Sequence, residues 1–240
     1  MMKRSLFVLL ALVAMSLSVQ AQKAEKVIAA YIEAVGGADT WEGIHTVTTE
    51  GSMKMQGMDF PIKVIQKQPH MVKTTMSVMG QEIVQAYNGK VGWTINPMMG
   101  STTPTELPEE QLKQFGNQRI LDPLMDIEGR GVTVEYVGKE TIDGDKYEVL
   151  SVTNDGITSR QFFDVKTGLR MMTFATVEAM GSTQEVKIVF EEYTEVDNVW
   201  IPFSVNTFSA GTVVTVLKLD KVTLNDDVAD AEFDMPSSDN

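Results

Sequence analysis

Apolar residues near the N-terminus recur at the spacing of an α-helix. Charged residues occupy the other side of this segment, as expected for a helix that packs on one face. Gly36 and Gly37 follow, and glycine readily adopts the left-handed conformation that ends many helices. The pattern predicts a helix that stops at this glycine pair and buries one stripe against a sheet. The stripe consists of Ala24, Val27, Ile28, Tyr31, Ile32 and Val35.

Beyond Ile44 the chain changes to short runs of alternating apolar and polar residues. Turn-forming pairs such as Asn88-Gly89 and Asp143-Gly144 separate these runs, which is typical of an antiparallel meander. The alternation lapses between 96 and 131, where Pro108 and Pro123 stand at positions suited to the first turn of a helix. We therefore expect an α+β fold, mainly antiparallel β, with 11–12 strands and two short helices inserted between its halves.

The first 21 residues have the organisation of a secretory signal peptide. Lys3 and Arg4 precede an apolar run, and the segment ends in small residues at Ala21. The run is shorter than the roughly 20 residues that a membrane-spanning helix needs, and no later stretch approaches that length. We expect cleavage after Ala21, a periplasmic chain without a transmembrane segment, one domain over 22–236, and a frayed tail at 237–240.

Charge and cysteine content narrow the classes of function. Removal of residues 1–21 leaves 18 basic and 33 acidic residues, a formal net charge of −15, which disfavours nucleic acids and anionic membrane surfaces as partners. The chain contains no cysteine, so disulfides, thiolate chemistry and an N-terminal lipidated cysteine are excluded.

Catalytic and metal-binding patterns are weak throughout. The chain has two histidines, His45 and His70, and neither belongs to a paired histidine motif with a glutamate. No G-x-S-x-G elbow is present, and the acidic clusters lack the spacing of a calcium loop. We therefore predict no catalytic residue, no metal and no cofactor, and regard a hydrolase as the weakest alternative.

Four segments carry a resemblance to a known family. They are AYNGKVGWTINP at 86–97, TIDGDKYEVLSV with QFFDVKTGLR within 141–170, and VFEEYTEVDNVWIPFSV at 189–205. In this order, the four segments resemble the LolA-like superfamily of periplasmic carriers that sort outer-membrane lipoproteins. The opening YIEAVGGADTWEGIHTVTTEG at 31–51 is also similar to a module appended to some pitrilysin-type peptidases.

The resemblance implies a strongly curved half-barrel whose concave face is covered by the N-terminal helix and the two short helices. It also implies a role: holding a lipid, a lipoprotein acyl chain or a similar hydrophobic ligand between the sheet and a helical lid. Burial of each methylene group contributes about 0.8 kcal/mol, so apolar area and a movable lid suffice for such a carrier. The resemblance carries over no catalytic residue.

Candidate cavity residues come from the strands around Asn88-Gly89 and from the helical insertion. The first half of the chain is also rich in methionine, whose flexible side chain suits variable apolar ligands or fills gaps in an ordinary core. Trp93 is likewise either a core anchor or a cavity wall. The predicted ligand-binding residues are Val64, Met76, Val78, Trp93, Ile95, Leu112, Phe115 and Leu124.

Two functions from different classes fit these patterns. The first is a non-enzymatic periplasmic carrier or binding protein for a hydrophobic ligand, either a lipid or an acylated protein. The alternative is an envelope interaction module that carries no ligand and partners a protease or an assembly machine. A continuous, filled apolar core would favour the alternative, whereas an accessible apolar cavity would favour the carrier.

Overall fold

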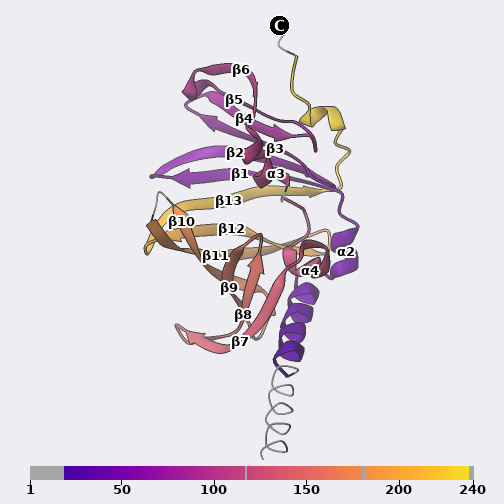
Figure 1. Cartoon of the computed structure of the whole chain (residues 1–240), viewed down its shortest axis with the longest axis vertical. Helices are drawn as coiled ribbons and strands as arrows, with labels where there is room; N and C mark the ends of the chain where they lie inside the picture. Colours follow the sequence, from indigo (N-terminus) through magenta and orange to yellow (C-terminus); the bar gives the residue numbers. More distant parts are fainter. Residues whose placement is uncertain (1–18, 117, 180–181, 238–240) are drawn as a thin grey trace, which may run out of the picture. The chain divides into compact units, whose positions relative to one another are not determined.

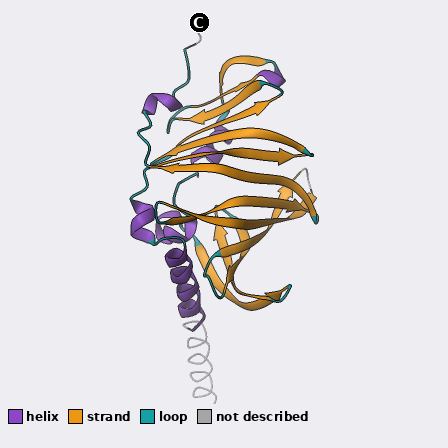
Figure 2. Ribbon diagram, turned by 180° about the vertical axis from the view of Figure 1, so that it is seen from behind, coloured by secondary structure: helices purple, strands orange, loops and turns teal. Residues whose placement is uncertain are grey.

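The computed structural model describes residues 19–116, 118–179 and 182–237. Strands make up most of this part of the chain (Figures 1 and 2). They hydrogen-bond in the order β6-β5-β4-β3-β2-β1-β13-β12-β11-β10-β9-β8-β7, so consecutive strands along the chain are usually neighbours in the sheet. The strands are β1 (Thr46–Met55), β2 (Met58–Lys67), β3 (Met71–Val78), β4 (Gln81–Tyr87), β5 (Gly92–Asn96), β6 (Ser101–Glu106), β7 (Thr133–Ile142), β8 (Asp145–Asn154), β9 (Ile157–Asp164), β10 (Arg170–Ala179), β11 (Ser182–Val196), β12 (Val199–Ser209) and β13 (Thr212–Leu224).

The helices are few and mostly short. The described part of the N-terminal helix covers residues 19–34, and it is followed by the short segments α2 (Ala38–Glu42), η1 (Pro97–Met99), α3 (Glu109–Gly116), η2 (Pro123–Met125), α4 (Ile127–Arg130) and η3 (Asp230–Phe233). None of the helices within the described residues is long and apolar enough to cross a membrane.

The chain divides into two compact units, which we describe separately. Unit 1 comprises residues 1–37, 123–189 and 209–211, and unit 2 comprises residues 38–122, 190–208 and 212–240. The prediction of a single domain over 22–236 stays a prediction. The predicted signal peptide falls mainly on residues 1–18, and the predicted frayed tail mainly on 238–240, both of which lie outside the described residues.

In unit 1 the N-terminal helix packs one apolar stripe onto strands β8 and β9. The rings of Tyr31 and Phe163 meet edge-on at 5.3 Å, and Val27 is also buried. The amides of Gly36 and Gly37 donate to the carbonyls of Glu33 and Ile32, and both glycines have positive φ. The predicted helix and its glycine stop are therefore confirmed.

The opposite face of the unit 1 strands has its own apolar cluster. Side chains on a strand alternate between faces, so Phe162 points away from its neighbour Phe163. The cluster joins Tyr147, Val149, Phe162 and Met172, with Phe174 and Val189 packed beside it. The middle of β8 and the end of β9 are consequently buried on both faces, as the adjacent buried residues Val149 and Leu150 of β8 and Phe162 and Phe163 of β9 show.

In unit 2 the core lies along β1, β12 and β13. It contains Ile44, Val47, Val199 and Val222, and Trp41 of α2 packs against it. Trp41 belongs to the short helix α2, and the alternation predicted beyond Ile44 begins with strand β1.

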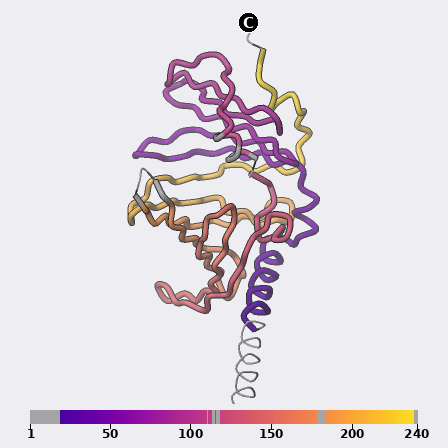
Figure 3. The backbone as a smooth tube through the Cα atoms, in the orientation of Figure 1, coloured from indigo at the N-terminus to yellow at the C-terminus, as the bar shows by residue number. Residues whose placement is uncertain are grey.

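The C-terminal segment of unit 2 lies along one face of strands β3 to β5 (Figure 3). Phe233 is fully buried, and its carbonyl accepts a 2.9 Å hydrogen bond from Trp93 Nε1. Lys73 and Glu232 form an ion pair at 2.7 Å, and Lys67 and Asp230 form another at 2.6 Å. The tail is therefore fixed to this face by one buried hydrogen bond, one buried ring and two ion pairs.

The structure has one strand more than the sequence predicts. The additional strand is β6, Ser101–Glu106, in the stretch where we expected only helices and loops. It lies at the edge of the sheet and carries Pro104, and an edge strand tolerates proline because one side of it needs no ladder hydrogen bonds. Its residues are mostly exposed on both faces, so they show no apolar alternation. The two predicted helices after Pro108 and Pro123 are confirmed as α3 and as η2 with α4.

Gly51 provides a test of the packing in unit 2. The pairing of β1 with β13 shifts register between Glu50 and Gly51, and a Cβ atom at residue 51 would come within 2.0 Å of the Lys218 carbonyl oxygen. We expect Gly51→Ala to lower the free energy of unfolding by about 3 kcal/mol, the upper end for overpacking, because the neighbouring atom belongs to the backbone. Gly43→Ala, whose Cβ would have ordinary contacts of 3.4 Å or more, is the matched control. Urea denaturation of both variants measures the effect, and equal losses would contradict the close approach.

Candidate functional site

A strip of apolar side chains, half-buried apart from the buried Ile62, lies on one face of unit 2. The register pairs Ile62 with Met76 and Met76 with Ile83, and residues paired across antiparallel strands point to the same face. Val64 lies two residues after Ile62 and Val78 lies two residues after Met76, so both side chains share this face. We call this surface the apolar face; it consists of Met53, Phe60, Ile62, Val64, Met76, Val78, Ile83 and Leu217.

Helix α3 covers part of the same face. Gly92 of β5 pairs with Tyr87, and a Cβ atom at Gly92 would lie 2.4 Å from Leu112 Cδ2. The ring of Phe115 is 6.4 Å from the ring of Tyr87. Tyr87 in turn pairs with Val72, which is on the face of Met76. Leu112 and Phe115 therefore lie on the side of the sheet to which Val64, Met76 and Val78 point.

Trp93 and Ile95 point to the other face. Trp93 pairs with Ala86, one residue away from the pair of Tyr87 and Gly92, so its side chain is opposite to Leu112. It is 2% exposed and packs with Val84 and Ala86, with Ile95 and Met235 beside them. Of the two roles considered for Trp93, the structure supports the core anchor. The predicted cavity set is thus divided between two faces.

Leu124 belongs to unit 1, whereas the other predicted residues belong to unit 2. It belongs to η2 in unit 1, where it is 2% exposed. The structure therefore groups five of the eight predicted residues on one face of unit 2: Val64, Met76, Val78, Leu112 and Phe115.

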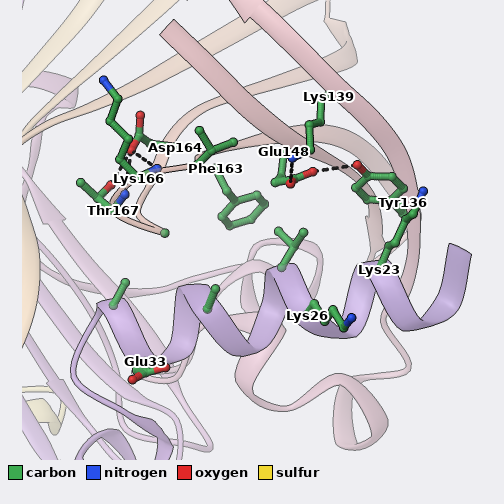
Figure 4. Close-up of a pocket in the computed structure, with 15 residues that line it drawn as sticks. Lys23, Lys26, Glu33, Tyr136, Lys139, Glu148, Phe163, Asp164, Lys166 and Thr167 are labelled. Carbon is green, nitrogen blue, oxygen red and sulfur yellow. Dashed lines mark hydrogen bonds and ion pairs between the residues drawn. The ribbon is translucent and has the colours of Figure 1, made fainter. Parts of the chain in front are cut away.

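A pocket of about 690 Å³ lies in unit 1 between the N-terminal helix and strands β7 to β9 (Figure 4). We call it the helix pocket. Its floor is apolar, with the ring of Phe163 at the centre and Val27 and Ala30 on the helix side. Its rim carries charged side chains from both sides: Lys23, Lys26, Glu33, Lys139, Glu148, Asp164 and Lys166.

One end of the helix pocket is organised around Glu148. Tyr136 Oη donates a 2.7 Å hydrogen bond to Glu148 Oε2, and Lys139 Nζ lies 2.9 Å from Glu148 Oε1 (Figure 4). Lys23 Nζ lies 5.3 Å from the centroid of the Tyr136 ring, within the range of a cation–π contact. Burial, the hydrogen bond to Glu148 and the negative charge of that carboxylate raise the pKa of Tyr136 from 10.0 to about 12.

The other end is formed by the turn between β9 and β10. Asp164 Oδ1 accepts hydrogen bonds from the backbone amides of Lys166 and Thr167 at 2.9 and 2.8 Å, which fixes the turn. Gly168 has a φ of +77°, and a Cβ atom there would lie 2.8 Å from the Ala30 carbonyl oxygen. Only glycine fits this close approach of the turn to the helix.

The helix pocket is not anticipated by the sequence. Its lysines occupy the polar side of an amphipathic helix, a position usually explained by solvent exposure, and the residues opposite are more than 100 positions away. The periodicity does show that Lys23, Lys26 and Ala30 share one flank of the helix, at spacings of three and four. It does not show which strand lies beside that flank.

Within residues 19–116, 118–179 and 182–237, no group of three or more histidine, aspartate or glutamate side chains is placed to hold a metal ion. The absence of a metal and of a catalytic residue in this protein stays a prediction.

Tyr136 provides a pH-dependent test of the helix pocket. Its folded-state pKa of about 12 exceeds the unfolded value of about 10, so the folded protein retains a proton that the unfolded chain loses between these values. The Tyr136 contribution to stability is therefore present below pH 10 and is lost as the pH rises towards 12. We expect the free energy of unfolding to fall more steeply over this range in the wild type than in Tyr136→Phe. Urea denaturation at several pH values measures this, and equal slopes would show that Tyr136 is unperturbed.

Comparisons with known proteins give a fold. No protein-family model and no curated protein matches the chain. Among solved structures, it is similar to a LolA superfamily protein from Nitrosomonas europaea, with a TM-score of 0.57, 13% identity, and 88% of this chain and 97% of that chain covered. A DUF1329 family protein from Desulfovibrio piger gives a TM-score of 0.59 with the same identity and coverage. A domain from Vibrio parahaemolyticus that is named for outer membrane lipoprotein sorting gives 0.57 at 10% identity, with the same coverage. The predicted fold class is confirmed: the chain is mainly antiparallel β and has a LolA-like fold.

Proposed function

We propose that this protein is a non-enzymatic periplasmic carrier or binding protein for a hydrophobic ligand, a lipid or the acyl chain of a lipoprotein. The observation that carries the proposal is the apolar face of unit 2. There, Val64, Met76 and Val78 are half-buried on the side of the sheet that Leu112 and Phe115 of α3 cover. Contiguous apolar surface that remains partly accessible often marks a binding site.

The chemistry of the apolar face suits an alkyl chain. Its described side chains are aliphatic, aromatic or thioether groups, so a ligand held there gains by removal from water and needs no directional bond. Methionine adapts to ligands of different shape, and both Met53 and Met76 lie on this face. The similarity to structures named for LolA and for lipoprotein sorting supports the proposal at the level of the fold.

The function as an envelope interaction module is the second candidate. It is favoured by methionines at the hairpin tips of unit 2, since Met79 is 81% exposed and Met99 is 84% exposed. Methionine-rich surfaces also bind proteins. This candidate needs no ligand on the apolar face, so a binding experiment separates the two functions.

The apolar face can be tested with fatty acids of increasing length. Each added methylene contributes at most about 0.8 kcal/mol, so affinity should rise with chain length. Met76→Glu would bring a carboxylate onto the face, and we expect it to weaken binding at least tenfold because the charge loses hydration there. The measurement is displacement of a fluorescent fatty acid, with a thermal melt of each variant.

The matched control for Met76→Glu is Thr75→Glu. Thr75 pairs with Val84, on the other face of the same strand, so this variant adds the same charge away from the apolar face. It should leave fatty-acid binding within about twofold of the wild type. If the wild type shows no saturable response that depends on chain length, the proposed carrier function is wrong, and the function as an interaction module replaces it.

Export can be tested on the protein recovered from cells. We propose that the chain is periplasmic and is cleaved after Ala21, on the basis of the charged, apolar and small-residue regions of residues 1–21. Intact-mass analysis of periplasmic material should give a chain that begins at Gln22 and carries no acyl group. A mass that includes residues 1–21 would contradict the predicted cleavage. A mass increased by an acyl group would contradict the prediction that the chain is not lipidated.

A further inference from the structure

We propose that the helix pocket of unit 1 is a second binding site, which takes an anionic amphiphile: an alkyl chain that ends in a carboxylate or phosphate group. None of its lining residues belongs to the apolar face of unit 2, so this inference does not depend on the function proposed above. Figure 4 shows the arrangement, with Phe163 between the helix and the strands and charged side chains on either side.

The apolar part of the ligand has a defined floor. Phe163 is 1% exposed and Val27 is buried, so neither moves easily, and Ala30 leaves space above them because its side chain is a single methyl group. Val165 extends the floor towards the turn and remains 40% exposed. A volume of about 690 Å³ lies in the usual range for small-molecule sites, roughly 300 to 1,000 Å³.

The carboxylates of the helix pocket are largely engaged by the protein itself. Glu148 accepts a hydrogen bond from Tyr136 and pairs with Lys139. Asp164 Oδ1 accepts hydrogen bonds from the backbone of its own turn. Glu33 is the remaining acidic residue of the rim. Two of the three negative charges are thus already balanced by local donors.

The lysines are less engaged. No carboxylate among the described residues lies within ion-pair distance of Lys23, Lys26 or Lys166, although Lys23 lies over the Tyr136 ring. The rim has four lysines and three acidic residues, a local charge of +1, in a chain whose formal net charge is −13. The negative charge elsewhere is screened beyond about 8 Å at physiological ionic strength, so the nearby lysines determine which head group is preferred.

The geometry places the head group at one end of the helix pocket. Lys23 and Lys26 are three residues apart on the helix, so their side chains lie on the same flank. The contact of Lys23 with Tyr136 holds its ammonium group at the end where Lys139 also lies. An anionic head group at this end would leave its alkyl chain to run along Ala30 and Phe163 towards the turn at Gly168.

The test compares ligands with the same twelve-carbon chain below their micelle-forming concentrations. Dodecanoate and dodecyl phosphate should bind the wild type at least tenfold more tightly than dodecyl maltoside or dodecyltrimethylammonium, as measured by calorimetry. Inorganic phosphate alone should bind more weakly than dodecyl phosphate, because it lacks the alkyl chain. Amide shifts in NMR spectra should locate the ligand at residues 23–34 and 163–168. Equal affinity for all four twelve-carbon ligands, or no binding of any of them, would overturn the proposal.

Variants of Ala30 separate charge from size. Ala30 is exposed on the helix, so Ala30→Glu and Ala30→Gln should both fold, which thermal melts would check. We expect Ala30→Glu to weaken dodecanoate binding at this site at least tenfold and Ala30→Gln to weaken it about threefold or less.

The lysines are tested with the double variant Lys23→Gln, Lys26→Gln. It should also reduce the affinity for dodecanoate about tenfold without changing the affinity for dodecyl maltoside. Lys90→Gln, on the surface of unit 2, is the control for a lost lysine.

The outcomes distinguish the two proposed sites. Dodecanoate shifts confined to unit 2 residues such as Met76 would overturn the helix pocket and support the apolar face. Shifts confined to the helix pocket would support this inference while contradicting the carrier function of the apolar face. If Ala30→Glu binds dodecanoate as the wild type does, the helix pocket is not the site.

Discussion

Strand register is the constraint that determines which side chains each face of unit 2 presents. Because side chains alternate with a period of two, neighbouring residues of β3 face different surroundings. Met76 points to the side that α3 partly covers, whereas Lys73 points to the side where the C-terminal segment runs and pairs there with Glu232. A shift of one residue would exchange these environments. The register therefore determines which apolar side chains remain accessible and which are enclosed.

The C-terminal segment makes the two faces of these strands unequal. Exposed ion pairs contribute little to stability, so Lys67–Asp230 and Lys73–Glu232 mainly align the segment. The larger contribution comes from burial of the Phe233 ring and from the hydrogen bond of the Trp93 indole to the Phe233 carbonyl, since an unpaired buried indole N–H would be costly. The chain thus encloses the face of Trp93 with its own tail. Among the described residues, the face of Met76 is covered only in part, by α3, and Met76 itself stays half-buried.

The sequence predicts local elements better than it predicts faces. The N-terminal helix, its stop at Gly36-Gly37 and most hairpins follow from periodicity and turn residues, because these signals are local. Strand β6 is missed because an exposed edge strand has no apolar alternation. Trp93 and Met76 are assigned to one cavity because each belongs to an alternating strand, but the relation between their strands depends on hydrogen-bond register. The register is visible only once Ala86 is paired with Trp93 and Met76 with Ile83.

The helix pocket depends on a contact that no local pattern contains. The apolar stripe with Val27 and Tyr31 holds the N-terminal helix against the sheet. Lys23, Lys26 and Ala30 then lie on one flank of the helix. Strands β7 to β9 and the turn at Gly168 form the opposite wall of the pocket. Val27 also contributes to the floor, but the lysines and Ala30 are outside the buried stripe. The residues that hold the helix in place are therefore largely distinct from those that would meet a ligand. This separation leaves the charge of the helix pocket free to vary while the packing of Tyr31 on Phe163 is retained, so the residues that stabilise the helix and the residues proposed to select a ligand are different positions of the same helix.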